Sequence, residues 1–208
     1  MTIKPILFNA EMVRAILDGR KTCTRRVVKT RRKDACGFYV TKRLDGSFTG
    51  VYEYDEDGRM FENQLIPPYK PGDILYVRET FIQAAAHTFW YKADDKSWVS
   101  EGLRWKPSIH MPKEAARIWL KVTDVRVERL QEITEDGAKA EGANWKNGKN
   151  VGWEEKMKRT ATERFAEIWN STIKKSDLDR YGWDANPYVF VIEFSKIDKP
   201  EEAEHERK

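Results

Sequence analysis

Residues 19–26 bring an amine, two hydroxyls and three guanidinium groups together; they read Gly-Arg-Lys-Thr-Cys-Thr-Arg-Arg. A neutral lysine can take the proton of a neighbouring hydroxyl, and Lys21 lies three residues before Thr24. Burial or nearby cations would favour that neutral form, and the arginines of the segment supply cations. Arginine can also hold a phosphate or stabilise a developing oxyanion. The segment therefore predicts a nucleophilic site, with a basic loop leaving a helix as the alternative.

Two carboxylates are candidates for the proton donor that such a site needs. Glu141 falls in the last turn of a predicted short helix, where the carbonyl ends carry partial negative charge and disfavour an ionised carboxyl. A protonated carboxyl there could protonate a leaving amine, although a glutamate at a helix end is usually solvated. Glu79 ends a predicted strand beside a predicted pocket and competes for this role. Ser108 and Arg117 are further candidates for substrate contact.

The charge distribution favours a polyanionic partner. The 208 residues carry a net charge of only +4, but basic residues crowd 25–33 and acidic residues dominate 53–62. A basic cluster beside a pocket suits a nucleoside or RNA, and a solvated loop is the alternative. Hydrophobic residues make up 40% of the chain, which is enough for a core.

The cysteines and histidines argue against a metal site. Cys23 and Cys36 form no Cys-x-x-Cys pair, and the three histidines lack ligand spacing, so we expect neither zinc nor another cofactor. We identify no signal peptide and no apolar run long enough to span a membrane. These features predict a cytoplasmic protein in a reducing compartment, without membrane contact.

Hydrophobic periodicity and turn signals place the elements around these residues. Asn9 is a suitable N-cap and Gly19 a suitable C-terminal stop for a helix over 10–18. Asp-Gly turns divide a β-meander over 38–61. The other predicted elements are a strand over 73–78, a hairpin over 89–99 turning at Asp94-Asp95, a strand over 118–130, a short helix from Thr134, a helix over 154–169 and a strand over 188–194.

This order predicts an α+β fold, namely a small mixed barrel with helices at its rim rather than a parallel α/β sheet. We expect one domain over 1–197, with elaborations at about 27–70 and 80–117. The tail 198–208 is highly charged, which is typical of disorder.

A family resemblance adds to these predictions. Gly19-Arg20-Lys21-Thr22-x-Thr24-x-Arg26 after an amphipathic helix resembles the signature of ASCH domains, whose fold is a PUA-like β-barrel. Four later segments resemble family segments in the same order: 71–75, 122–130, 133–141 and 188–194. In addition, 105–112 is similar to a segment of the larger ASCH proteins of phages and prophages.

The resemblance implies a chemistry. The best-defined enzymes of the family are small bacterial N4-acetylcytidine amidohydrolases, which use a lysine as proton acceptor, a threonine as nucleophile and a glutamate as proton donor. Lys21, Thr24 and Glu141 match those positions. Arg20 and Arg26 would bind the substrate, and no cofactor is needed. The alternatives are a non-catalytic module that binds RNA or a modified base, and an RNA-cleaving ASCH ribonuclease.

Overall fold

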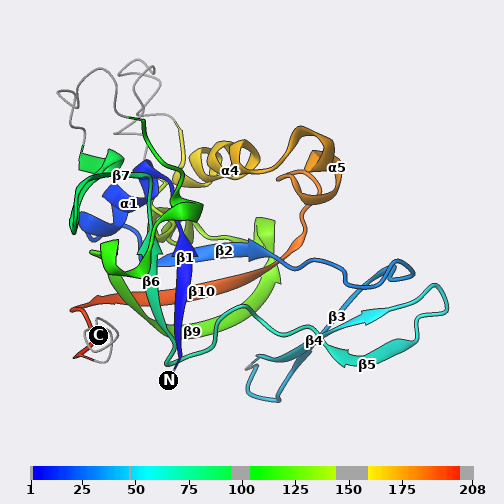
Figure 1. Ribbon diagram of the computed structural model, residues 1–208. Coiled ribbons are helices and arrows are strands. Elements are labelled where there is room, and N and C mark those ends of the chain that lie inside the picture. The colour runs from blue at the N-terminus through cyan, green and yellow to red at the C-terminus, as the bar shows by residue number, and fades with distance from the viewer. Residues whose placement is uncertain (1, 47, 95–103, 144–158, 202–208) are drawn as a thin grey trace. The chain divides into compact units, whose positions relative to one another are not determined.

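The computed structural model describes residues 2–46, 48–94, 104–143 and 159–201 (Figure 1). The chain divides into two compact units. Unit 1 comprises residues 1–22, 71–123 and 194–208, and unit 2 comprises residues 23–70 and 124–193. Two long strands, β9 (Trp119–Arg129) and β10 (Tyr188–Ile197), contribute residues to both units.

The strands form three sheets. The largest has the order β1-β6-β9-β10-β2, with β1 at Ile3–Leu7, β6 at Ile74–Arg78 and β2 at Cys23–Val27. In it, β1 runs parallel to β6, whereas β9 is antiparallel to β6 and β10 is antiparallel to β2. A second sheet contains β3 (Gly37–Lys42), β4 (Phe48–Tyr54) and β5 (Met60–Gln64), and a third contains β7 (Phe81–Ala85) and β8 (Thr88–Tyr91). The predicted α+β class is confirmed, and the described residues form no closed barrel.

In unit 1, the helix α1 (Ala10–Leu17) leads directly to the chemically rich segment. The Asn9 side chain accepts a 2.9 Å hydrogen bond from the backbone N–H of Met12, as its prediction as N-cap requires. Gly19 ends the helix with a φ of +72°, a conformation that side-chain-bearing residues rarely adopt. One core cluster of the unit contains six buried residues, Ile74, Phe81, Met111, Ala115, Ala116 and Trp119.

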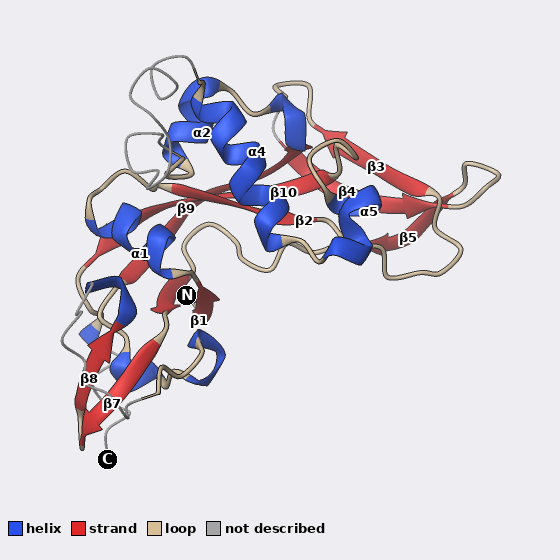
Figure 2. Ribbon diagram, turned by 90° about the horizontal axis from the view of Figure 1, so that it is seen from above, coloured by secondary structure: helices blue, strands red, loops and turns tan. Residues whose placement is uncertain are grey.

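In unit 2, two helices cover the sheet next to β10 (Figure 2). The short helix α2 (Glu135–Ala140) begins at Thr134, whose hydroxyl accepts from the N–H of Gly137, and α4 (Ala161–Thr172) begins with a capping box. The apolar face of α4 is buried against β10 through Phe165, Trp169, Val189 and Val191. A further short helix, α5 (Leu178–Tyr181), precedes β10.

Most predicted elements of the chain are confirmed. The meander is the β3–β4–β5 sheet, which Figure 1 shows as an arm beyond the end of β2. The strands predicted over 73–78, 118–130 and 188–194 are β6, β9 and β10, with β10 continuing to Ile197. The near-continuous apolar run in β10 is buried at Val189, Phe190, Val191, Ile192 and Phe194.

Two predictions were wrong. The hairpin lies earlier than 89–99, because β8 pairs with β7 and residues 92–94 form a 3₁₀ turn; the rest of the predicted second arm lies outside the described residues. The helix predicted from Glu154 begins at Ala161, because the capping box of Thr160 and Glu163 satisfies the first free N–H groups there. Residues 154–158 lie outside the described part.

Among the helices of the described residues, none combines the length and the apolar character needed to cross a bilayer. The charged tail lies outside the description from residue 202 onward.

Candidate functional site

The strand β2 positions a buried hydroxyl next to an arginine. Thr24 is 1% exposed, and its Oγ1 lies 3.0 Å from Nη1 of Arg26, which donates to it. Residues two apart on a strand share a face, so the extended conformation of β2 accounts for the contact. A guanidinium beside a hydroxyl favours its alkoxide form, because the positive charge stabilises the developing negative oxygen.

The neighbouring Arg25 joins two carboxylates from distant parts of unit 2. Its Nε and Nη2 lie 3.0 and 2.5 Å from Oε1 of Glu128, and its Nη1 lies 3.2 Å from Oε1 of Glu141. The Arg25 side chain is 2% exposed and that of Glu141 is 5% exposed. These charges are therefore held by one another rather than by bulk water.

The end of α2 gives Glu141 its position. Glu141 is the C-cap of that helix, as predicted, and its backbone N–H donates to the carbonyl of Gly137. Arg25 also lies beside Gly137 of that helix, because a Cβ built on Gly137 would be in ordinary van der Waals contact with Arg25 Nη2, at 3.5 Å.

The two arginines of β2 respond differently to burial. Burial lowers the pKa of Arg26, with the charges of Glu141 and Tyr69 opposing this effect. Burial also acts to lower the pKa of Arg25, but the negative charges of Glu141 and Glu128 outweigh it, so that the pKa is raised. Arg25 is thus the cation fixed by the carboxylates, and Arg26 is the cation directed at the Thr24 hydroxyl.

Five predicted site residues lie in unit 1, and Lys21 and Arg20 are the two that follow α1, whereas Thr24, Arg26 and Glu141 lie in unit 2. Lys21 is only 2% exposed, and its Nζ lies 5.4 Å from the centre of the Phe8 ring. Its backbone N–H donates to the carbonyl of Ala15. The Arg20 side chain forms an ion pair with Asp18, with Nη2 and Oδ2 2.8 Å apart.

The remaining predicted residues lie elsewhere in unit 1. Glu79 is 1% exposed, and Arg117 binds both of its oxygens, with Nε–Oε1 at 2.8 Å and Nη2–Oε2 at 3.0 Å. Burial raises the pKa of the Glu79 carboxyl, and the Arg117 charge opposes this rise. Ser108 begins a 3₁₀ turn, Ser108–His110, and its carbonyl accepts from the N–H of Met111. The structure thus pairs Glu79 with Arg117 in an internal ion pair.

Two further residues of unit 2 lie close to Arg25 and Arg26 and were not predicted from the sequence. Glu128 binds Arg25 and also lies within 3.4 Å of Arg126 through its Oε2. β9 also carries Lys121, Asp124 and Arg126, so one more charged residue in this strand gave no signal. Tyr69 is the second, because burial raises the pKa of its phenol while the charge of Arg26 opposes this. Its sequence context, between prolines and a turn, carried no signal.

Within the part of the chain that the structure describes, no group of three or more histidine, cysteine, aspartate or glutamate side chains is arranged to hold a metal ion. Comparison of the chain with protein-family models, curated proteins and solved structures gave no match.

Proposed function

We propose that this protein is an amidohydrolase that removes an acyl group from a modified nucleoside such as N4-acetylcytidine, and that it has a PUA-like fold of the ASCH type. The observation that carries the proposal is the buried Thr24 hydroxyl, held 3.0 Å from the guanidinium of Arg26 on the same strand. Its support comes from the buried Glu141 in the same unit and from the buried amine of Lys21, three residues before Thr24 in the chain.

In the proposed reaction, Thr24 Oγ1 attacks the acyl carbon while Lys21 takes the hydroxyl proton. The carbon–nitrogen bond then breaks, and Glu141 gives a proton to the leaving amine. Water next attacks the acyl–threonine ester and passes a proton to Glu141, while Lys21 returns its proton to the Thr24 oxygen. The products are a carboxylic acid and the free nucleoside amine, and the protein regains its initial protonation.

Arg25 and Arg26 have separate roles in this scheme. Arg26 stabilises the developing negative charge on the Thr24 oxygen and orients the substrate. Arg25 contacts Oε1 of Glu141, so we assign the transferred proton to Oε2. The low exposure of Thr24 and Glu141 suits a small acyl group rather than a large one.

The test is hydrolysis of N4-acetylcytidine, free and within an RNA strand, followed by chromatography of the released cytidine. We expect Thr24→Val to lower kcat/KM by about 1,000-fold or more, since it removes the nucleophile and keeps the side-chain shape. Glu141→Gln should lower it by about 100-fold or more. Lys21→Ala should also inactivate the protein. Thr22→Val, which removes the exposed neighbouring hydroxyl, is the matched control.

The same experiment separates the rival functions. A wild-type protein inert on both substrates, or a fully active Thr24→Val variant, contradicts the proposal. If the wild type cuts a labelled unmodified RNA into fragments and Lys21→Ala does not, the protein is instead a ribonuclease. If Glu79→Gln abolishes hydrolysis and Glu141→Gln does not, Glu79 is the working carboxylate. Circular dichroism of each variant verifies that a loss of activity does not result from a loss of folding.

A further inference from the structure

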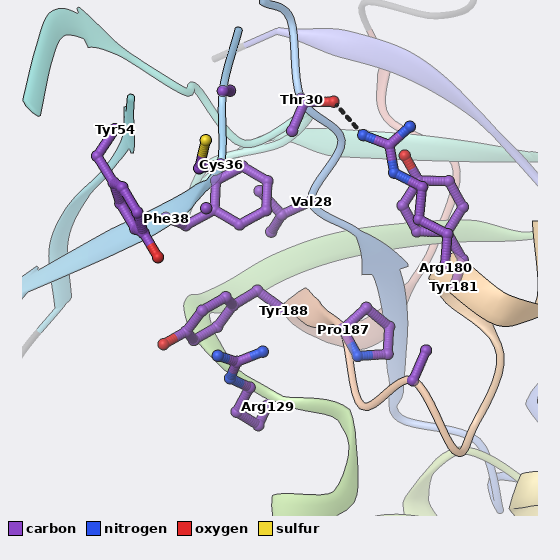
Figure 3. Close-up of a pocket in the computed structure, with 13 residues that line it drawn as sticks. Val28, Thr30, Cys36, Phe38, Tyr54, Arg129, Arg180, Tyr181, Pro187 and Tyr188 are labelled. Atoms are coloured by element: carbon purple, nitrogen blue, oxygen red, sulfur yellow. Dashed lines mark hydrogen bonds between the residues drawn. The ribbon is translucent and has the colours of Figure 1, made fainter. Parts of the chain in front are cut away.

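A second feature of unit 2 is a pocket of about 270 Å³ between the end of β2, the β3–β4 sheet and the start of β10 (Figure 3). The chain supplies four aromatic rings and two guanidinium groups to its lining: Phe38, Tyr54, Tyr181, Tyr188, Arg129 and Arg180. None of the described residues that line it is acidic. The proposed hydrolytic reaction uses no residue of this pocket.

Two aromatic rings and an arginine of the pocket contact one another. The Arg129 guanidinium carbon lies 3.8 Å from the centre of the Tyr188 ring, and its Nη1 donates to the carbonyl of Asn186 at 3.1 Å. Phe38 meets Tyr188 edge-on, with ring centres 6.0 Å apart and planes at 86°. Figure 3 shows Arg129 beside the Tyr188 ring. Planar groups held in this way offer flat surfaces to another planar group.

Positive charge surrounds the rings. Arg180 is exposed and is held by a 2.7 Å hydrogen bond from its Nη2 to Thr30 Oγ1. The segment that forms one wall of the pocket also carries four exposed basic residues, Lys29, Arg31, Arg32 and Lys33. Arg32 is paired with Asp34, so part of this charge is internally balanced. The segment as a whole remains strongly basic.

We propose that this pocket binds one base of a single-stranded nucleic acid, with the neighbouring phosphates at Arg180 and the basic residues 29–33. Aromatic faces combined with a basic rim are the features by which proteins hold single strands, because every base has a face that can stack. Thr24 lies four residues before Val28 of the pocket, about 13 Å away along an extended chain. The inference rests on the geometry of unit 2 and does not require the hydrolase activity.

The test is the fluorescence anisotropy of labelled 12-residue RNA and DNA oligonucleotides of mixed sequence, at 50 and 200 mM salt. Binding of either strand supports the proposal, and the two arms tell RNA from DNA. If the protein contacts three phosphates, the rise from 50 to 200 mM salt should weaken binding by roughly 20-fold. Tyr188→Ala should weaken it by about 5- to 150-fold, and Tyr188→Phe, which keeps the ring, should not.

Arg180→Ala should weaken binding and reduce its salt dependence. Arg59→Ala is the matched control, because Arg59 is an exposed arginine in the β4–β5 turn, outside the pocket. Should Tyr188→Ala fail to fold, the alkylation of Cys36 in the wild-type protein provides an independent measurement. Cys36 is exposed and lines the pocket whereas Cys23 is buried, so bound oligonucleotide should slow alkylation of Cys36.

Three results would overturn the inference: no binding of either oligonucleotide at 50 mM salt, binding that leaves Cys36 alkylation unchanged, or displacement by polyglutamate at equal charge concentration. The last result would assign the pocket to an acidic protein partner. Failure of the hydrolase proposal gives a different pattern, in which oligonucleotides bind and protect Cys36 while N4-acetylcytidine is not hydrolysed.

Discussion

Each unit contains an arginine bound to two carboxylates. The arginine is buried in unit 2, whereas in unit 1 it is partly exposed and one of its carboxylates is buried. In unit 2, the Arg25 side chain is 2% exposed and its partners Glu128 and Glu141 are 16% and 5% exposed. In unit 1, Arg117 is 28% exposed, whereas its partner Glu79 is 1% exposed. The second carboxylate of Arg117, Asp94, is 27% exposed and lies 2.7 Å from its Nη1.

The surroundings of the two clusters also differ. Arg117 uses Nε and Nη2 on one carboxylate, and its guanidinium carbon lies 4.0 Å from the centre of the Tyr91 ring. Such a bidentate, stacked pair is typical of an arginine that stabilises a fold. Beside Arg25, in contrast, Arg26 points its charge at the Thr24 hydroxyl. A buried ion pair is therefore weak evidence for a reactive site, and a cation directed at a nucleophile is stronger evidence.

Removal of each arginine measures this difference, and Arg25→Ala should have the larger effect. It leaves two carboxylates with low exposure and like charge close together, which costs about 3–5 kcal/mol of unfolding free energy. Arg117→Ala should cost less, about 1–2 kcal/mol, because Glu79 can take up a proton and Asp94 remains partly solvated. Urea unfolding at pH 7 gives the two values.

Hydrogen exchange then localises each effect. Arg25→Ala should increase the exchange of peptides from β2 and α2, and Arg117→Ala that of peptides from β6 and β7. An Arg117→Ala variant less stable than Arg25→Ala would reverse the comparison. It would mean that the unit 1 pair contributes more to the fold than the buried network of β2.

The pH dependence of Glu79→Gln is the next largest test. Because burial raises the pKa of Glu79, its contribution to stability is fully present below about pH 4.5 and is lost as the pH rises through the raised pKa. The neutral glutamine has no such loss, so stability should shift in favour of Glu79→Gln by on the order of 1 kcal/mol between pH 4 and 7. Thermal unfolding at several pH values measures this shift.

The opposite result for Glu79 is equally informative. If the wild type gains stability relative to Glu79→Gln as the pH rises, the Arg117 charge outweighs the effect of burial. The unit 1 pair would then resemble the Arg25 cluster, in which opposite charges outweigh burial.

Local sequence signals predicted the parts of the molecule that depend on neighbours in the chain. Asn9 and Gly19 defined α1, and alternation along β2 accounts for the contact of Thr24 with Arg26. The true turn between β7 and β8 was missed because it contains His87 at a φ of 62° rather than a glycine, while Asp94-Asp95 looked like a turn.

The partners of the buried charges could not be predicted in this way. Arg25 is separated from Glu128 by 103 residues and from Glu141 by 116, so only the paired strands and α2 bring them together. Glu79 and Arg117 were both selected as candidate site residues, but pattern alone did not show that they bind each other. The identities of reactive side chains are thus local information, whereas their protonation and availability depend on the fold.

Glu135→Gln is expected to have the smallest effect, and the pH dependence of its stability is opposite in sign to that of Glu79→Gln. Its carboxylate accepts hydrogen bonds from the backbone N–H groups of Ala161 and Thr162 at the start of α4, which lowers its pKa below 4.5. Its contribution is therefore present above pH 4.5 and lost as the pH falls through the lowered value. Glu135→Gln should cost about 0.5–1 kcal/mol at pH 7, as expected for an exposed carboxylate at a helix N-terminus, and progressively less as the pH falls toward 3. Asp136→Asn, in the same turn of α2, is the control, and an equal loss at both pH values would show that the Glu135 charge does not stabilise α4.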